Sequence, residues 1–357
     1  MNIWGNSVRI ELFGESRGKA VGCIVDGLPA GELLDLDAIR IMMDRRLSRM
    51  DGASTPRREG DAFEVVSGVY KGKTSGAPLC AIIRNLDADF SNSNSETVVR
   101  PSHADYAARV KYMGYNDPRG GGQLSGRLTA PLVFAGAVCK TMLLRRGIAV
   151  GAHVASISDV FDERFDPVNV SKGDIDALDP YFPLLNPSIR PDMEKALRFA
   201  ADNNTSVGGI VECAAVGMPA GKGRPIFESV EGMLSQLLFS IPGVKGVDFG
   251  AGFDISSMFG HESNDQWRYD ETGKPITTTN HAGGINGGIT NGMPVIAQAA
   301  FRPVPTIGRP QNSIDVETMK NISIELRGRN DVCILPRGAV AVEAAMCICM
   351  LDMLEET

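Results

Sequence analysis

Four short segments of the chain combine glycine with arginine, histidine or aspartate, whose side chains can bind anions or move protons. They are residues 14–18, residues 100–105 together with 119–127, residues 280–288, and residues 328–331. Glycine lets the backbone approach a ligand closely and present N–H groups to an anion, and arginine makes bidentate contacts with phosphate or carboxylate. These segments therefore predict a site for a small ligand that carries several negative charges.

His103 is the strongest candidate for a proton donor among the four histidines. It lies in a polar segment between Arg100 and Asp105, and imidazole titrates near neutral pH. His281 precedes a glycine run, where a loop hydrogen bond is the simpler interpretation, and His153 falls in a strand-like segment, which favours a structural role. The chain has no Cys-x-x-Cys pair and no histidine spacing typical of a metal site, so we expect no metal.

The elements that must position these segments are mixed, without strict alternation of strands and helices. Apolar patterns predict strands at 8–13, 20–25, 63–69, 79–83, 207–215, 295–301 and 322–326, and helices at 36–50, 128–144, 194–201, 230–238 and 339–354. The helix at 128–144 is apolar nearly all round, which predicts a central position. The strand at 79–83 is apolar throughout, which predicts burial of both its faces. We expect a layered α+β protein.

Two stretches of the chain occur twice in the same order. Residues 21–31 are echoed by 207–221, and residues 74–81 are echoed by 290–297. We therefore predict an internal duplication, in which halves of about 1–200 and 201–357 form one pseudo-symmetric domain with a site between them.

The composition argues against several classes of protein. With 36 Lys and Arg against 43 Asp and Glu, the formal charge is −7, which argues against a nucleic-acid binder. Hydrophobic residues make up 43% of the chain, enough for a core, so a disordered chain is excluded. We expect no membrane association and a cytoplasmic location, because no signal peptide is recognisable and the apolar run 128–144 is shorter than the ~20 residues of a membrane span.

Taken together and in order, the motifs resemble those of chorismate synthase. The matching segments, which extend over nearly the whole chain, are GESRG at 14–18, DRR at 44–46, PRRE at 56–59, RPSHAD at 100–105, RGGG at 119–122, NHAGGI at 280–285 and GRND at 328–331. The resemblance implies a β-α-β layered sandwich, usually a homotetramer. It also implies an anti-1,4-elimination that converts 5-enolpyruvylshikimate 3-phosphate to chorismate and phosphate and requires reduced FMN. NADPH is expected only indirectly, for flavin reduction by an external reductase, since no reductase segment is visible.

The resemblance also implies roles for individual residues. His103 corresponds to the acid near the leaving phosphate, and Asp331 to the group that acts with the flavin in taking the ring proton. The substrate anions are expected to meet Arg45, Arg46, Arg127 and Arg337. The flavin is expected to contact Gln123, Leu124, Ser125, Pro242, Gly243, Gly287, Arg302, Pro303, Thr306 and Arg329.

Arg17 departs from the family pattern at a position of chemical importance. It stands where the family carries a histidine that protonates or stabilises the reduced flavin. Arginine does not donate a proton near neutral pH because its pKa is above ~12, although it can supply a permanent positive charge at the same catalytic position. Gln123 and Leu124, in place of Arg-Ser, are further departures. They leave open an alternative, a degenerate homologue that binds flavin or phosphate ligands but turns over little.

Overall fold

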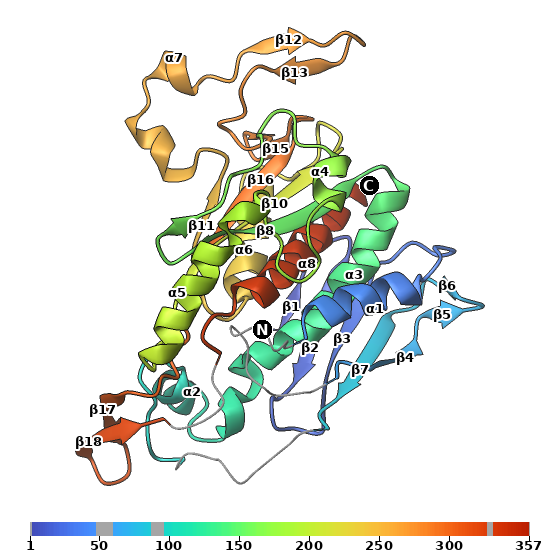
Figure 1. The fold of residues 1–357 in the computed structure, drawn as a ribbon. Coiled ribbons are helices and arrows are strands. Elements are labelled where there is room, and N and C mark those ends of the chain that lie inside the picture. The colour runs from blue at the N-terminus through green and yellow to red at the C-terminus, as the bar shows by residue number, and fades with distance from the viewer. Residues whose placement is uncertain (1, 48–59, 87–95, 327–330, 357) are drawn as a thin grey trace.

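Two five-stranded antiparallel sheets form the outer layers of the fold (Figure 1). The computed structural model describes residues 2–47, 60–86, 96–326 and 331–356. The first sheet has the order β1 (Ile3–Trp4), β2 (Arg9–Gly14), β3 (Ala20–Asp26), β7 (Leu79–Arg84) and β4 (Phe63–Ser67). The second has the order β11 (Val244–Phe249), β16 (Val295–Phe301), β10 (Gly209–Val216), β8 (Ala149–Ile157) and β9 (Val160–Phe161).

Long apolar helices fill the space between the sheets. Helix α3 (Thr129–Arg145) packs on β3 and β7, helix α8 (Leu335–Leu354) packs on β8 and β10, and the two helices pack on each other. Helix α1 (Leu36–Arg45) lies against α3, and α6 (Val230–Ser240) lies against α8. The predicted β-α-β layering and the central position of the 128–144 helix are confirmed.

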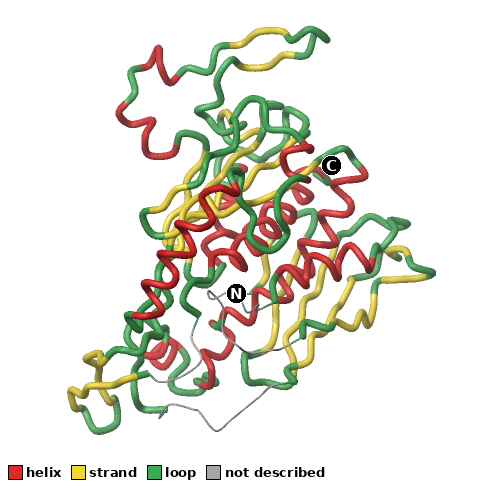
Figure 2. Tube along the Cα trace, in the orientation of Figure 1, coloured by secondary structure: helices red, strands yellow, loops and turns green. Residues whose placement is uncertain are grey.

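Shorter elements connect these layers. They are β5 (Val69–Tyr70), β6 (Lys73–Thr74), α2 (Asp105–Lys111), η1 (Arg119–Leu124), η2 (Gly126–Leu128), α4 (Lys172–Asp176), η3 (Pro187–Ile189), α5 (Arg190–Asp202), η4 (Gly252–Ser257), α7 (Gly260–Ser263), β12 (Trp267–Tyr269), β13 (Pro275–Thr277), β14 (Ile285–Asn286), β15 (Ile289–Thr290), β17 (Pro310–Asp315) and β18 (Lys320–Glu325). The segment from η4 to β13 projects from the body as an arm (Figure 2).

The stretch Gly126–Arg145 is, in the described part of the chain, long and apolar enough to cross a membrane by length and composition. Most of it is buried inside the fold, however, against the first sheet and α8. Its apolar side chains therefore contribute to the protein core, which explains their number without a membrane.

The two sheets repeat one topology. In the first half, β2, β3, α1, β4, β7 and α3 follow one another along the chain, and in the second half β8, β10, α6, β11, β16 and α8 do so. The strand orders β2-β3-β7-β4 and β8-β10-β16-β11 match as well. The repeated order of elements passes from one set to the other between α3 and β8, near residue 147, whereas the echoed motifs predict halves that meet near residue 200. The segment from β9 to α5, which carries no echoed motif, lies between these two positions.

Thr74 and Thr290 occupy equivalent positions in the two halves and make the same hydrogen bonds. Thr74 bonds through its backbone N–H and carbonyl, at 2.8 Å, to the turn that follows β3, and Thr290 bonds in the same way to the turn that follows β10. Each hydroxyl donates to a proline carbonyl. The matched partners are Pro29 and Pro219, Gly31 and Gly221, and Glu32 and Lys222. These paired contacts support the duplication that the echoed motifs predict.

Two predicted elements differ from the structure. Strand β7 buries Leu79, Ala81 and Ile83 against the helices but leaves Cys80 and Ile82 half-buried, because no helix among the described residues covers the outer face of the first sheet. Helix α1 ends at Arg45, so the apolar stripe predicted to continue to residue 50 does not stay helical to that point. Residues 48–50 lie outside the described residues.

Candidate active site

A cavity of about 1600 Å³ opens where loops from both halves of the chain meet. Its wall is formed by the β2–β3 loop, the segments around α2, η1 and η2, the residues after α6 and β16, and the first turns of α8. Among the described residues that line it, ten are Lys or Arg and five are Asp or Glu. The volume exceeds the roughly 300–1,000 Å³ of a pocket for one small ligand. The cavity therefore has the charge to bind anions and room for two ligands side by side.

The glycine run Gly120 to Gly122 packs against the β2–β3 loop. All three glycines have positive φ, between 55° and 86°, a region that disfavours any side chain. A Cβ atom on Gly122 would lie 2.3 Å from the carbonyl oxygen of Asp117, and one on Gly120 would lie 3.0 Å from Ser16 Oγ. The Ser16 N–H donates to the Gly122 carbonyl at 3.0 Å. Glycine at these positions lets the two loops meet and brings Arg17 to the cavity wall.

Arg46 and Arg127 converge on one buried carboxylate, that of Asp61. Arg46 Nε donates to Asp61 Oδ2 at 2.7 Å, and Arg127 Nη1 pairs with Asp61 Oδ1. The Asp61 side chain is only 1% exposed. Burial, together with the neighbouring charges of Arg127 and Arg337, lowers the pKa of Arg46, which the Asp61 carboxylate opposes. Both arginines line the cavity, so their outward N–H groups can bind an anion there.

Asp331 and Arg337 form an ion pair at the start of α8. Arg337 Nη2 pairs with Asp331 Oδ2, and both residues line the cavity. Arg337 Nε is buried and has no hydrogen-bond partner among the described residues. This cation can therefore hold the carboxylate in place and still offer a donor to a ligand.

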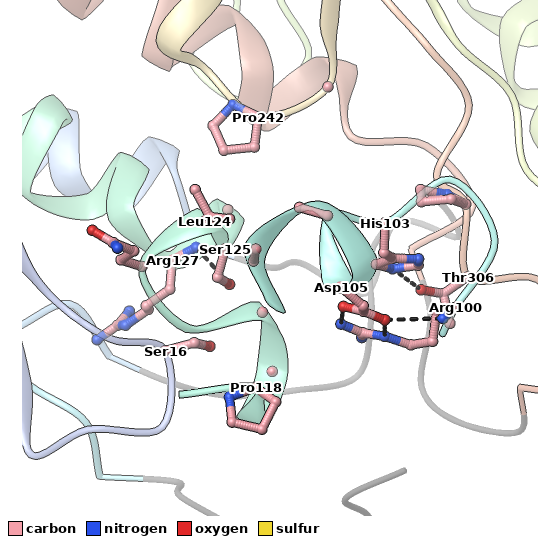
Figure 3. Close-up of a pocket in the computed structure, with 18 of the residues that line it drawn as sticks. Ser16, Arg100, His103, Asp105, Pro118, Leu124, Ser125, Arg127, Pro242 and Thr306 are labelled. Atoms are coloured by element: carbon pink, nitrogen blue, oxygen red, sulfur yellow. Dashed lines mark hydrogen bonds and ion pairs between the residues drawn. The ribbon is translucent and has the colours of Figure 1, made fainter. Parts of the chain in front are cut away.

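His103 is hydrogen-bonded at both ring nitrogens, and Figure 3 marks the bond to Thr306. Nδ1 lies 3.0 Å from the carbonyl oxygen of Pro101, which can only accept, so Nδ1 carries the hydrogen. Nε2 lies 3.1 Å from Thr306 Oγ1 and accepts from that hydroxyl in the neutral ring. Burial and the positive charges of Arg100 and Arg302 lower the pKa of His103, although Asp105 opposes them. These effects favour the neutral imidazole, whose proton-accepting nitrogen is then Nε2.

Arg100 and Asp105 frame this histidine. Arg100 Nε and Nη2 donate to the two carboxylate oxygens of Asp105 at 2.8 and 2.7 Å, as the dashed lines in Figure 3 mark. Burial alone raises the pKa of Asp105, but the Arg100 guanidinium and backbone N–H outweigh it and lower that pKa. The bidentate pair fixes the loop that carries His103 at the start of α2.

Comparison with known proteins identifies the family of this chain. The family described as chorismate synthase matches residues 8–354. The chorismate synthase of Thermococcus gammatolerans is 42% identical over 353 residues, which cover 98% of this chain and 96% of that protein, and the one of Dehalococcoides mccartyi is 39% identical over 357 residues, covering 99% and 96%. A crystal structure of chorismate synthase superposes with a TM-score of 0.78 at 27% identity, covering 98% of this chain and 92% of that one.

The chain belongs to the chorismate synthase family. The protein is therefore a lyase of the shikimate pathway, as its sequence predicts, and the comparisons do not favour the alternative of a degenerate homologue. Membership of the chorismate synthase family also implies a flavin cofactor.

Most residues that the resemblance to chorismate synthase singles out line this cavity. They are Arg17, Arg46, His103, Gln123, Leu124, Ser125, Arg127, Pro242, Gly243, Arg302, Pro303, Thr306, Asp331 and Arg337. They come from both halves of the chain. Arg17 and Arg337, which lie furthest apart in the sequence, line the same cavity. Arg329 was predicted as a flavin contact and lies outside the described residues.

Two predicted site residues do not line the cavity. Arg45, predicted to bind substrate, instead donates to both oxygens of Glu343 on α8, at 2.9 and 2.7 Å, and to the carbonyl of Pro180. Neighbouring residues on a helix point about 100° apart, so Arg45 and Arg46 face different surroundings. Gly287, predicted as a flavin contact, lies in the exposed turn between β14 and β15.

The segment 280–288, which includes Gly287, has a structural role in this chain. The Asn280 side chain is buried and donates to the carbonyls of Pro167 and Pro294, while its oxygen accepts from the Gly284 N–H. His153 is likewise structural, as predicted, since it is buried in β8 between the carboxylates of Asp162 and Glu212.

Asp61 and Asn85 hold site residues in place, although the sequence motifs do not predict them. The Asn85 amide donates to the carbonyls of Glu15 and Gly18 at 3.0 and 2.9 Å, and its oxygen accepts from Arg127 Nε at 2.9 Å. Each polar residue stands next to a strand of the first sheet, Asp61 before β4 and Asn85 after β7. A polar residue at the end of an apolar strand, close in sequence to an arginine cluster, was the available signal.

Proposed function

We propose that the chain converts 5-enolpyruvylshikimate 3-phosphate to chorismate and phosphate in this cavity, with reduced FMN bound beside the substrate. The observation that carries the proposal is the convergence of three arginines, Arg46, Arg127 and Arg337, on the cavity that also contains His103 and Asp331. The substrate carries a phosphate and two carboxylates, so a cavity that combines cations with proton-transferring groups matches its chemistry.

The residues of the cavity fit a flavin. The positive-φ glycines of the 120–122 run leave the backbone open to a ligand, and Ser125, Gly243 and Thr306 border the same space. Arg302 and Arg17 supply positive charge for the FMN phosphate and for an anionic ring. Gln123, Leu124, Pro242, Pro303 and Arg329 complete the proposed contacts. When bound, reduced FMN supplies an electron-rich ring that stabilises charge developing on the substrate.

His103 is proposed as the acid that assists the departure of phosphate. Its pKa is lowered in the free protein by burial and by Arg100 and Arg302. A bound phosphate dianion is an opposite charge, which favours the protonated imidazole and raises its pKa. Nε2 is the nitrogen that takes this proton, since Nδ1 is committed to the carbonyl of Pro101. Binding of the substrate phosphate thus favours the protonated form of His103, which can then protonate the leaving group.

Asp331 is proposed as the acceptor, acting with the flavin, of the proton that leaves the ring. The carbon–oxygen bond to phosphate breaks, the ring loses a proton, and the electron pair of the carbon–hydrogen bond becomes part of the new double bond. Arg337 keeps the carboxylate at the cavity wall through their ion pair. Arg17, which cannot donate a proton at neutral pH, is proposed to stabilise negative charge on the flavin with its permanent cation.

The test is an anaerobic assay of phosphate release and chorismate formation, started by chemically reduced FMN. Equal amounts of the two products are expected, with none when FMN is left oxidised. A His103→Ala variant that loses turnover, beside a His261→Ala variant that keeps it, would assign the activity to this cavity, because His261 lies in the exposed helix α7. Absence of both products from the unaltered chain would overturn the proposal.

We also propose a homotetramer in the cytoplasm that receives reduced flavin from an external NADPH-dependent reductase. Support for assembly comes from the projecting arm (Figure 2). Large apolar or aromatic side chains of this segment are exposed, namely Phe253, Ile255, Phe259, Trp267 and Tyr269. Sedimentation equilibrium tests the assembly, and a mass of one subunit would contradict it. Addition of NADPH and oxidised FMN without reductase should give no turnover.

A further inference from the structure

Asp61 lies behind the two substrate arginines and does not itself line the cavity. It precedes β4 and is almost wholly buried. Its Oδ1 pairs with Arg127, which lies in η2, the short helix capped by Ser125. Its Oδ2 accepts a hydrogen bond from Arg46, the residue that caps the end of α1. One carboxylate thus joins cations from separate elements of the first half.

Each guanidinium also donates to groups other than Asp61, and Arg127 Nη2 lies 3.5 Å from the carbonyl oxygen of Arg84. Arg46 Nη1 donates to Thr129 Oγ1 at 3.3 Å, and Arg127 Nε donates to Asn85 Oδ1 at 2.9 Å. After these bonds each guanidinium keeps N–H groups for a ligand, because it has five donors in a rigid fork. The guanidinium groups of Arg46 and Arg127 are therefore held in a fixed relative position before a ligand binds.

Two buried cations this close repel each other unless a negative charge lies between them. The positive charge of Arg127 is already among the causes that lower the pKa of Arg46. Without Asp61, the pair is expected to separate, or one side chain to turn toward water. In either case the distance between the two anion-binding forks changes.

We propose that Asp61 is a positioning residue, which sets the spacing of Arg46 and Arg127 and so aligns the anionic substrate for elimination. The inference rests on the proposed function, since it names how that site holds its substrate. Alignment errors of about 1 Å can cost roughly 10²-fold in rate, so a residue that never touches the substrate can still decide turnover.

The chain contains a matched control for this proposal. Glu343 on α8 is equally buried, with 1% of its side chain exposed, and it also holds two cations, Arg45 and Lys140. It does not line the cavity. Asp61→Asn and Glu343→Gln therefore remove the same kind of charge, one behind the substrate arginines and one away from them.

The experiment compares the two variants by calorimetric affinity for 5-enolpyruvylshikimate 3-phosphate, by kcat and KM, and by thermal unfolding. Both variants are expected to unfold at lower temperature. Only Asp61→Asn is expected to lose affinity and kcat, each by at least about tenfold. A pure charge effect would have the opposite sign, because removing a carboxylate makes the site more positive and tightens anion binding.

Unchanged or tighter binding by Asp61→Asn, with kcat within about threefold of the unaltered chain, would overturn the proposal. An equal loss in Glu343→Gln would also overturn it, because the effect would then follow from destabilisation. If Asp61→Asn does not fold, Asp61→Glu keeps the charge, displaces the arginines and is judged by the same criterion. If the unaltered chain forms no chorismate, the proposed function fails, whereas the affinity comparison still tests Asp61.

Discussion

Thr306 Oγ1 donates a hydrogen bond to His103 Nε2 at 3.1 Å, across the cavity from the segment after β16 to the segment before α2. The hydroxyl can reverse its role, because it accepts as well as donates. When Nε2 is protonated, Thr306 becomes the acceptor and holds the imidazolium in the same orientation. The pair can therefore keep one geometry through both protonation states of the acid.

Thr306→Val removes this hydroxyl with little change of shape. We expect kcat to fall by about 10- to 100-fold, because the imidazole loses its orienting partner and the loss of one charge-assisted hydrogen bond costs about 1.5–3 kcal/mol. Thr306→Ser, which keeps the hydroxyl, should retain most of the activity. Steady-state kinetics of both variants are the measurement, and equal rates in Val and Ser would contradict the orienting role.

His103→Ala should lower kcat by ~10²–10⁴-fold, the usual contribution of a general acid. In the unaltered chain, activity that needs protonated His103 is present below its pKa and lost above it. Burial and nearby cations lower the pKa of His103 in the free protein, and the substrate phosphate raises it in the complex. Because kcat reports the complex and kcat/KM the free protein, kcat should lose activity at a higher pH than kcat/KM. Coincident pH profiles for the two parameters would contradict the substrate-prepared acid.

Asp331→Asn replaces the proposed proton acceptor by a neutral group of the same size. We expect kcat to fall by at least about tenfold while the thermal unfolding temperature changes little, since Asp331 is not in the core. Substrate affinity measured by calorimetry serves as the control and should fall less than kcat. A near-normal kcat would remove Asp331 from the mechanism.

Arg17→His restores a side chain that can exchange protons near neutral pH. We expect kcat to rise by ~10-fold or more, because general acid assistance then adds to the positive charge at this position. Arg17→Lys keeps the charge without an accessible proton and should leave kcat close to that of the unaltered chain. A rate no higher in Arg17→His than in Arg17→Lys would mean that fixed charge is sufficient.

Glu343→Gln tests the buried ion pair between Glu343 and Arg45, which holds Arg45 away from the cavity. Although burial itself raises the pKa of Glu343, Arg45 and Lys140 outweigh it and lower that pKa to about 2. A carboxylate whose pKa is lower in the folded than in the unfolded state stabilises the fold at pH values above its unfolded pKa of about 4.3. This stabilisation is lost as the pH falls toward about 2. The difference in unfolding temperature between variant and unaltered chain should be constant from pH 7 to 5 and narrow below pH 4.5. A difference that does not depend on pH would contradict the pairing.

Several parts of the fold follow from the sequence because local pattern decides them. The apolar character of α3 predicts a central helix, and α3 lies between the sheets. The segment that forms α8 is predicted to be helical, and it is. The echo of Thr74 by Thr290 predicts repeated turns, and the two threonines make matched hydrogen bonds. The order of the glycine and arginine motifs identifies the family, and most of those residues meet at one cavity.

The sequence by itself determined the family, the layered class and the residue types at the site, because these depend on motifs and on periodicity along the chain. Only the tertiary structure decided which arginine serves the cavity. Arg45 and Arg46 are adjacent and chemically identical, yet Glu343, nearly 300 residues away, pairs with the first, while Asp61 holds the second. Long-range ion pairs of this kind depend on how separate elements pack, so the charge of a side chain in the sequence does not tell where that charge is used.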